Sequence, residues 1–341
     1  MKKSYKLLGF LAVVTSIVSL ASCNSAANND DDNNEDSIDY LDKDSMMLSP
    51  AGAPNLAVYS KVLTTSSLTT TTPADIPAQL LDTNSFYNYV VFDAVNALKL
   101  VKANKAKYTF LGLLTSGNYH LVGFNQEVDA VPAIGDHFVS FGKGLMTDEI
   151  MKFLVPEAYE SGSTINYLET GVSAVAQKLI AGPDGEYTSY WALIAEPALQ
   201  NVLNKNNKVK DYKNCTTWIK EKTDGKFDFI PQGGLFVKNS YYESSLTNVN
   251  NFMVQVKKDM TNAINNPTKV IEDITNSKMT SDDFTKKFGF NSSLIDPLQK
   301  NSSNLFGISD PKGLIGGDKA INTTKINEFL IEIGSASANH I

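Results

Sequence analysis

Residues 88–100, N-Y-V-V-F-D-A-V-N-A-L-K-L, decide the fold that we expect for this chain. Residues 89–92 are a β-rich run, and residues 95–101 then carry apolar side chains at helical spacing. The same change from strand to helix recurs on both sides of this stretch. Further strand-like runs lie at 108–115, 119–124, 137–141, 190–194 and 228–237, and helical spacing returns at 147–154, 172–180, 245–264 and 325–333. Strands that alternate with helices predict a mainly parallel sheet covered on both faces.

The alternation falls into two series, which predicts two α/β lobes. We expect residues 45–135 to form the first part of lobe 1, residues 136–232 to form lobe 2, and residues 233–341 to return to lobe 1. The chain would cross between the lobes near 123–137 and near 227–236. Ligands bind beyond the carboxyl ends of strands in such sheets, so two facing lobes make a cleft that a hinge can close.

The charge of the chain argues against nucleic acid as a partner. The formal charge of the 341 residues is −7, and residues 45–341 carry only −3 of net charge. A protein that binds nucleic acid or anionic lipid through its surface charge needs a basic field, which this sequence lacks. The apolar fraction of 42% is ordinary for a globular protein.

The amino-terminal leader has the pattern of an export signal. Lys2, Lys3 and Lys6 precede an apolar run at 7–18, which is too short for a ~30 Å hydrocarbon core. The leader ends in L-A-S-C at residues 20–23 and resembles the bacterial lipoprotein signal. That resemblance implies removal of residues 1–22 and lipidation of Cys23. The alternatives are an ordinary cleavage site with an incidental cysteine, or a leader that is not cut.

Residues 23–44 are expected to be a disordered, acidic tether. Residues 24–44 hold eight acidic side chains, one lysine and almost no large apolar ones. Such a segment buries too little surface to offset its ordering entropy, and its like charges keep it extended. We interpret this segment as a spacer between the lipid and the folded domain. The alternative is a flexible terminus without a function.

No catalytic or metal-binding motif stands out in the sequence. The three histidines, His120, His137 and His340, have no metal-ligand spacing, and Cys215 is the only cysteine besides Cys23. Nucleophile-elbow and phosphate-loop patterns are also missing. We therefore predict no catalytic residue, no metal and no cofactor.

Glycine-containing turns suggest where a ligand binds. Gly52 opens one helix in the first series, and Gly142 and Gly144 open one in the second. Helix N-termini at such turns present free N–H groups to a polar or anionic head group. The alternative is that these turns need glycine for their geometry alone.

From about residue 46 to residue 333 the chain resembles the substrate-binding lipoproteins of ABC importers. It is most similar to the group that includes binders of nitrate, sulfonates such as taurine, and thiamine-precursor pyrimidines. The matching pieces keep the family's order: S-P-A-G-A-P at 49–54, the block at 87–124, V-S-F-G-K-G-L at 139–145, W-A-L-I-A-E-P-A-L-Q at 191–200 and I-P-Q-G at 230–233. The resemblance implies the two-lobed periplasmic-binding-protein fold of type 2, with a cleft between the lobes and two hinge crossings.

The glycine turns, the aromatic side chains near the expected cleft and the segments that match the family together give the candidate ligand-binding residues. They are Ser49, Gly52, Ala53, Tyr87, Asp93, Asn96, Ser116, Asn118, Gly142, Lys143, Gly144, Tyr190, Glu196 and Gln232. Asp93 and Lys143 depart from the family's pattern. Asp93 would pair with a cationic or amino group and Lys143 with an anion; together they would bind a zwitterion or pair with each other. Tyr87 and Tyr190 would stack on a flat ligand, with core packing as the alternative.

Function follows as a set of expectations. The chain would be a lipid-anchored monomer on the extracellular face of the membrane, and it would deliver a small polar solute to an ABC permease. One rival is an enzyme on the same fold, similar to proteins of pyrimidine synthesis, although clustered histidines and cysteines are missing. The other rival is a surface adhesin or structural lipoprotein, in which the fold is only a scaffold.

Overall fold

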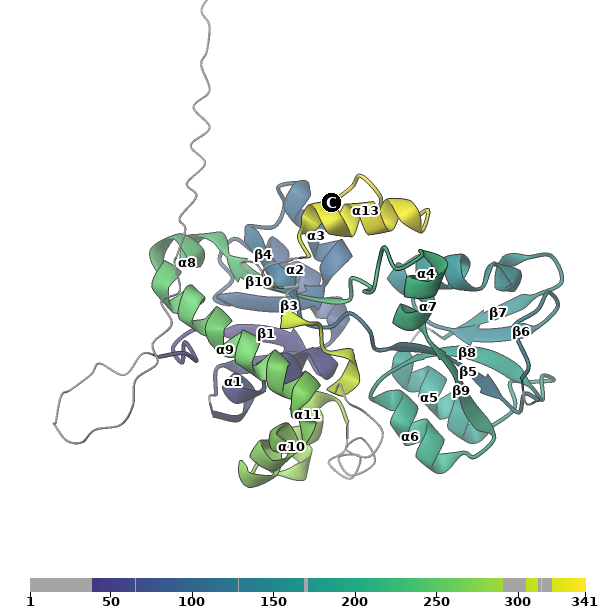
Figure 1. Cartoon of the computed structure of the whole chain (residues 1–341). Helices are drawn as coiled ribbons and strands as arrows, with labels where there is room; N and C mark the ends of the chain where they lie inside the picture. Colours follow the sequence, from purple (N-terminus) through teal and green to yellow (C-terminus); the bar gives the residue numbers. More distant parts are fainter. Residues whose placement is uncertain are drawn as a thin grey trace, which may run out of the picture. The chain divides into compact units, whose positions relative to one another are not determined.

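A computed structural model describes residues 39–64, 66–127, 129–168, 171–290, 305–311, 314 and 321–341 of the chain. The expected leader, the lipidation site at Cys23 and most of the expected tether lie outside the described residues. The described residues all belong to one unit, Ile38–Ile341. Within this unit the strands form two separate five-stranded sheets, labelled in Figure 1.

The first sheet belongs to lobe 1 and has the strand order β2-β1-β3-β10-β4. Its strands are β1 (Met47–Pro50), β2 (Leu68–Thr71), β3 (Tyr89–Asp93), β4 (Tyr108–Leu113) and β10 (Gly233–Lys238). β1 is parallel to β2 and β3, whereas β10 runs antiparallel to β3 and β4. The carboxyl ends of β1 and β3 therefore share one edge of the sheet with the amino end of β10.

Alternation along β3 explains how lobe 1 packs. Tyr89 and Val91 lie in the hydrophobic cluster with helix α9 (Leu246–Asn265), and Val90 and Phe92 lie in the cluster with helix α3 (Ala94–Lys102). Successive strand residues point to opposite faces, so one short apolar run covers both sides of the sheet. Lobe 1 is completed by α1 (Tyr59–Thr64), α2 (Ile76–Leu81), α8 (Asn239–Ser244), α10 (Pro267–Asn276), α11 (Ser281–Phe288), α13 (Thr323–Glu332), and the 3-10 turns η1 (Ala53–Val58), η2 (Pro73–Asp75) and η5 (Leu305–Gly307).

The second sheet belongs to lobe 2 and has the order β7-β6-β8-β5-β9. Its strands are β5 (Tyr119–Phe124), β6 (His137–Ser140), β7 (Thr164–Tyr167), β8 (Tyr190–Ala195) and β9 (Val209–Asn214). β6 is parallel to β7 and β8, and β5 is antiparallel to β8 and β9. Its helices are α4 (Met146–Leu154), α5 (Val172–Ala181), α6 (Ala198–Lys205), α7 (Cys215–Lys222) and the 3-10 turn η3 (Pro156–Tyr159).

The position of β5 corrects the expected domain boundary. We expected residues 45–135 in lobe 1, but β5 pairs with β8 and β9 of the second sheet, so the chain first crosses at 114–118. The pattern of side chains identifies a strand, yet it does not reveal which strands become its neighbours. Both sheets are mixed rather than mainly parallel, because β10 runs antiparallel to its neighbours in the first and β5 does so in the second.

One hydrophobic cluster joins the two lobes. It combines Val90 and Phe92 of the first sheet with Leu121 and Trp191 of the second, and it includes residues of α3, α4, α7 and α13. A separate cluster packs α5 and α6 against the other face of the second sheet. Among the described residues, no helix combines the length and the apolar character that a membrane crossing requires.

Candidate ligand-binding site

Two crossing segments run side by side between the lobes. The amide of Ile230 donates to the carbonyl of Ser116 at 2.8 Å, and the amide of Asn118 donates to Oε1 of Gln232 at 3.2 Å. A third segment of the chain joins them at residue 307, because its carbonyl accepts from the Ser116 amide at 3.0 Å. The predicted residues Ser116, Asn118 and Gln232 thus meet where the lobes join.

Asp93 lies at the lobe 1 side of this junction. It is the last residue of β3 and the N-cap of α3, and its carboxylate accepts from the Asn96 amide at 2.8 Å. Burial raises the pKa of the Asp93 carboxyl to about 6. The predicted residue Asn96 therefore contributes its backbone, and its half-buried side chain lies in the first turn of α3.

Gln232 connects Asp93 to the crossing segments. The carbonyl of Gln232 accepts from the Ala94 amide at 2.8 Å, and the next residue pairs with Asp93 in the sheet. Tyr119, at the start of β5, interacts with both Asp93 and the Gln232 side chain. Burial, with the nearby Asp93 charge adding to it, raises the pKa of the Tyr119 hydroxyl. Asp93, Tyr119 and Gln232 therefore form one cluster of polar groups.

Glu196 lies at the lobe 2 side, immediately after β8. Its amide donates to the Asn118 carbonyl at 2.8 Å, and Nδ2 of Asn118 donates to the Glu196 carbonyl at 3.4 Å. Its carboxylate accepts from Nε2 of Gln200 at 2.8 Å. Burial raises the pKa of the Glu196 carboxyl as well. The ends of β3 and β8 thus each place a carboxylate beside the crossing segments.

Three buried side-chain atoms lack a hydrogen-bond partner in the described part of the chain: Asn118 Oδ1, Ser140 Oγ and Gln232 Nε2. Asn118 and Gln232 belong to the crossing segments, and Ser140 ends β6. An unpaired buried polar group costs about 1–3 kcal/mol, so native proteins rarely keep one without a reason. All three atoms lie at strand ends or crossings, where a ligand of this fold class would be expected.

The glycine turn of lobe 2 is held by Asp148 from helix α4. The Asp148 carboxylate accepts from the Gly144 amide at 3.0 Å, from the Tyr159 hydroxyl at 2.6 Å and from the Tyr167 hydroxyl at 2.5 Å. Nζ of Lys152 lies 3.0 Å from the same carboxylate. Burial acts against ionisation, but these hydrogen bonds together hold the pKa of Asp148 below its usual value. The turn is therefore a rigid part of the lobe.

The predicted residues of this turn have different surroundings. Gly142 and Gly144 adopt φ values of 65° and 73°, which favour glycine, and a Cβ on Gly142 would lie 2.5 Å from Oγ1 of Thr147. Lys143 is exposed, and its Nζ lies 5.4 Å from the centre of the Tyr167 ring. Among the described residues Lys143 forms no ion pair with Asp93.

The first turn of lobe 1 is packed into the fold. The buried hydroxyl of Ser49 donates to Oδ1 of Asn55 at 2.6 Å, and Ala53 is buried in the cluster beneath α9. Gly52 has a φ of 150°, and a Cβ added to Gly289 would lie 3.2 Å from the Cα of Gly52. The turn exists as predicted, but the Ser49 side chain is engaged by the fold.

Tyr87 and Tyr190 are not brought together with the other candidates. Tyr87 precedes β3, and its carbonyl accepts from the Tyr108 hydroxyl at 2.9 Å. Tyr190 begins β8, is fully buried and donates to the Gly182 carbonyl at 2.8 Å. Each tyrosine lies a whole strand away, roughly 20 Å, from the carboxylate at the other end. Core packing is the alternative that their surroundings favour.

Sequence reasoning placed Tyr119 among the aromatic side chains near the expected cleft without choosing it for the site, and it missed Ser140 and Asp148. The available signal was position, since Tyr119 follows the first crossing and Ser140 ends a strand. Asp148 carried no local signal, because its tyrosine partners lie 11 and 19 residues further along the chain.

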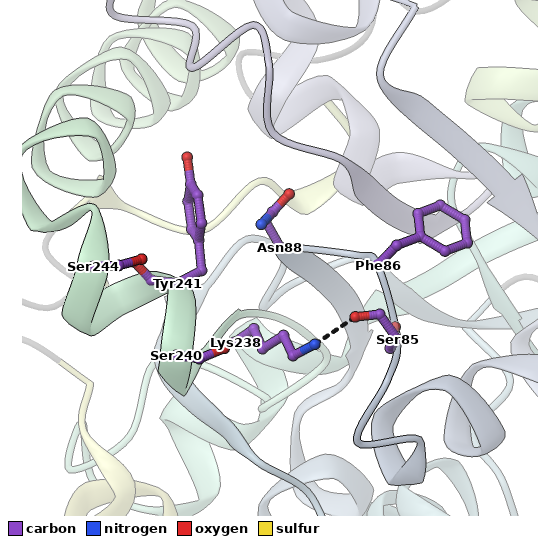
Figure 2. A pocket seen from close by; sticks show the side chains of 7 residues that line it. All are labelled: Ser85, Phe86, Asn88, Lys238, Ser240, Tyr241 and Ser244. Atoms are coloured by element: carbon purple, nitrogen blue, oxygen red, sulfur yellow. Dashed lines mark hydrogen bonds between the residues drawn. The ribbon is translucent and has the colours of Figure 1, made fainter.

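A hollow of about 330 Å³ lies at the opposite edge of lobe 1. In Figure 2 residues of α8 lie on one side of it, and the loop before β3 lies on the other. Its lining residues are Ser85, Phe86, Asn88, Lys238, Ser240, Tyr241 and Ser244. Nζ of Lys238 donates to the Ser85 carbonyl at 2.5 Å. Because Lys238 ends the antiparallel strand β10, this hollow is separate from the cluster at Asp93.

Comparison with solved structures identifies the class of fold. An ABC transporter protein from Parabacteroides distasonis matches with a TM-score of 0.59 and 14% identity, over 87% of this chain and 95% of that chain. The ligand-binding component of an ABC-type import system from Staphylococcus aureus, solved with zinc bound, matches with a TM-score of 0.53 and 12% identity, over 86% of this chain and 93% of that one. No protein-family model and no curated protein sequence matches the chain.

The chain therefore has the two-lobed periplasmic-binding fold that is found in substrate-binding proteins of ABC importers. The fold class and the resemblance expected from the sequence are confirmed. At these identities the likeness concerns the fold. Among the described residues, no group of three His, Cys, Asp or Glu side chains has an arrangement that could hold a metal ion.

Proposed function

We propose that this protein is a solute-binding receptor of an ABC importer, which captures a small polar solute between its lobes and delivers it to a permease. The observation that carries the proposal is the position of unpartnered buried polar atoms in the crossing segments, at Asn118 and Gln232, and at the end of β6, at Ser140. A binding protein needs such groups because a few well-placed polar atoms orient a ligand that its pocket otherwise encloses. The fold of the two matched transport proteins supports the same function.

The crossing segments are suited to a hinge. Residues 114–118 and 230–233 form one narrow bundle through hydrogen bonds such as the Leu114 amide to the Gly233 carbonyl at 2.7 Å. A hinge absorbs a domain rotation in a few residues between two rigid bodies. Solute capture would bring the carboxyl ends of β3 and β8 together around the ligand.

A ligand panel with two readouts tests the proposal. The panel contains amino acids, polyamines, sugars, nucleobases, sulfonates and inorganic oxyanions, each at millimolar concentration. We expect at least one class to raise the melting temperature by several degrees, because a solute that binds only the folded state stabilises it. The same solute should reduce the radius of gyration in X-ray scattering. If no class changes either quantity, the protein is not a solute receptor.

We further propose that Cys23 carries the lipid that holds the receptor at the extracellular face of the membrane. The proposal is supported by the L-A-S-C sequence at residues 20–23 and by the acidic segment that follows. A tether of this kind keeps a monomeric receptor at a high effective concentration near its permease. Cys23→Ser should move the protein from the membrane fraction to the soluble fraction, and a variant that stays with the membrane would contradict the anchor.

A binding role is favoured over an enzymatic one by the chemistry of Cys215. This thiol is buried at 1% exposure, and burial raises its pKa. A reactive cysteine needs an accessible thiolate, so Cys215 has the character of a structural side chain. Recovery of unchanged solute after incubation with the protein is the expected result, and turnover of the solute would favour the enzyme instead.

A further inference from the structure

We propose that the part of the solute held beside Asp93 is a protonated amine or amidine rather than an oxyanion. The inference rests on the proposed receptor function and names the chemical class of its solute. It starts from the groups that surround the lobe junction, which are acidic and rich in hydrogen-bond acceptors.

The positions where this fold would hold an anion are occupied by the chain's own carboxylates. Helix N-termini attract anions, and α3 and α4 both begin near strand ends at the junction. Asp93 caps α3 through the Asn96 amide, and Asp148 accepts from the Gly144 amide in the turn that leads into α4. An oxyanion at the start of α3 would meet the capping carboxylate of Asp93, and one beside the Gly144 amide would meet the carboxylate of Asp148.

The charge of Asp93 has no partner in the described part of the chain. None of the ion pairs found there includes Asp93 or Glu196. Lys99 favours the ionised form of Asp93 through space, and Glu149 opposes it. Burial raises the Asp93 pKa to about 6, so the group is mainly ionised at neutral pH. A cationic solute would compensate this half-buried charge.

An unpartnered atom specifies the rest of the solute. Oδ1 of Asn118 needs a donor, which an N–H group of an amine or amidine supplies. The Gln232 side chain is already engaged by the Asn118 amide and by the Tyr119 hydroxyl, so Oδ1 of Asn118 is the atom that specifies the solute. The rings of Tyr119 and Phe141 meet edge to face at 6.2 Å, and aromatic rings attract cations.

Lys143, the basic residue expected to serve an anion, has other contacts. Its Nζ lies over the Tyr167 ring, and Tyr167 in turn donates to Asp148. Lys143 therefore belongs to the surface of the lobe 2 turn. Of the two residues that differ from the family's pattern, Asp93 is the one that determines the charge of the site.

Paired sets of probes test the inference. Putrescine, agmatine and 4-aminopyridine are compared with methanesulfonate, nitrate and inorganic phosphate by thermal shift and calorimetry at constant ionic strength. We expect an amine to bind and Asp93→Asn to weaken it roughly tenfold or more, because the variant removes the charge that faces the cation. Asparagine is an equally good N-cap, so α3 should remain intact. Asp282→Asn, at an exposed carboxylate in α11, is the matched control and should bind like the wild type.

The pH dependence separates a charge effect from a structural one. Asp93 faces Lys99, Glu149 and Tyr119, and its ionised form is the one that binds a cation. Lowering the pH from about 8 to about 5 crosses the Asp93 pKa, so a proton then competes with the amine. The affinity of the wild type should fall over this range, and Asp93→Asn should lose most of that dependence.

The outcomes distinguish this inference from the proposed function. Binding of an oxyanion without any amine, or amine binding that Asp93→Asn leaves unchanged, would overturn the amine assignment while the receptor function stands. A sugar as the single ligand of the broad panel would do the same. Failure of every class in that panel would remove the receptor function itself.

Discussion

Asp148 is the residue whose contacts best explain the rigidity of lobe 2. Its carboxylate is 3% exposed and receives hydrogen bonds from a backbone amide, two tyrosines and a lysine. A single buried side chain therefore ties the glycine turn, helix α4, the turn η3 and strand β7 together. Asp93, by contrast, caps one helix and leaves much of its hydrogen-bonding capacity for a ligand.

Replacing Asp148 by alanine should destabilise the protein by about 3 kcal/mol. The variant would leave the Tyr167 hydroxyl and the Gly144 amide without their acceptor, and the Tyr159 hydroxyl would keep only the backbone carbonyl of residue 148 at 3.2 Å. Donors left without an acceptor in a largely buried network are costly. Denaturation with urea measures the change.

Lys152→Ala is the matched control for this prediction. The Lys152 side chain, which is 52% accessible, is the exposed partner of the same carboxylate. Its removal should lower the free energy of unfolding by less than about 1 kcal/mol. Equal losses for the two variants would refute the central role of Asp148.

Helix α9 contains a carboxylate that couples the stability of the fold to pH. Asp259 is buried, accepts from the amide of Ser60 at 3.0 Å and from its hydroxyl at 2.6 Å, and also accepts from Gln255 at 2.7 Å. Burial raises the pKa of Asp259 to about 7. The helix is thus joined to α1 through a group that holds its proton more tightly in the folded state than in the unfolded state.

We expect the free energy of unfolding to fall as the pH rises from about 4 to about 7. In this window the folded state binds more protons than the unfolded state, whose Asp259 has a pKa near 3.8, so raising the pH favours unfolding. Asp259→Asn should flatten the dependence of the unfolding free energy on pH, whether or not the variant is less stable than the wild type at every pH. Chemical denaturation across the pH range measures it, and an unchanged slope in the variant would contradict the assignment to Asp259.

The turn η5 crosses the junction at a close approach of two glycines. Gly307 has a φ of 65°, and a Cβ on it would lie 2.4 Å from the carbonyl carbon of Gly117. Gly334, after α13, has a similar φ of 68° with nothing within 4 Å of the same position. The two glycines share backbone strain and differ in the space around them.

Gly307→Ala should therefore cost clearly more stability than Gly334→Ala. In both variants the left-handed backbone lowers the free energy of unfolding by about 1 kcal/mol. In Gly307→Ala the clash at the crossing lowers it by about 2 kcal/mol more. Urea denaturation of the two variants provides the comparison. Comparable losses would mean that the backbones at the crossing separate easily.

At the scale of the whole molecule, the two sheets share one hydrophobic cluster and one bundle of crossing segments. Solute capture would therefore be expressed as a change in the angle between lobes rather than as rearrangement within either sheet. Asp93, which ends β3 and caps α3, and Glu196, which follows β8, define the chemistry of the proposed receptor.

Much of this architecture was predictable from local pattern. The β-rich apolar run of Tyr89 to Phe92 predicted β3, and Asp93 followed as the polar residue at its end. The sheet to which β5 belongs was not predictable, since pairing with β8 and β9 depends on residues about 70 to 90 positions away. Tyr87 and Tyr190 show the same limit, because a periodic pattern locates a strand without fixing which end carries the site.

Native mass spectrometry of the protein purified from its own host, without dialysis, tests the central claim most directly. The wild type is expected to carry the mass of a small amine-containing solute, and Asp93→Asn, purified in parallel, to have lost most of it. A wild-type protein without any added mass, or the same added mass on both proteins, would contradict a solute receptor centred on Asp93.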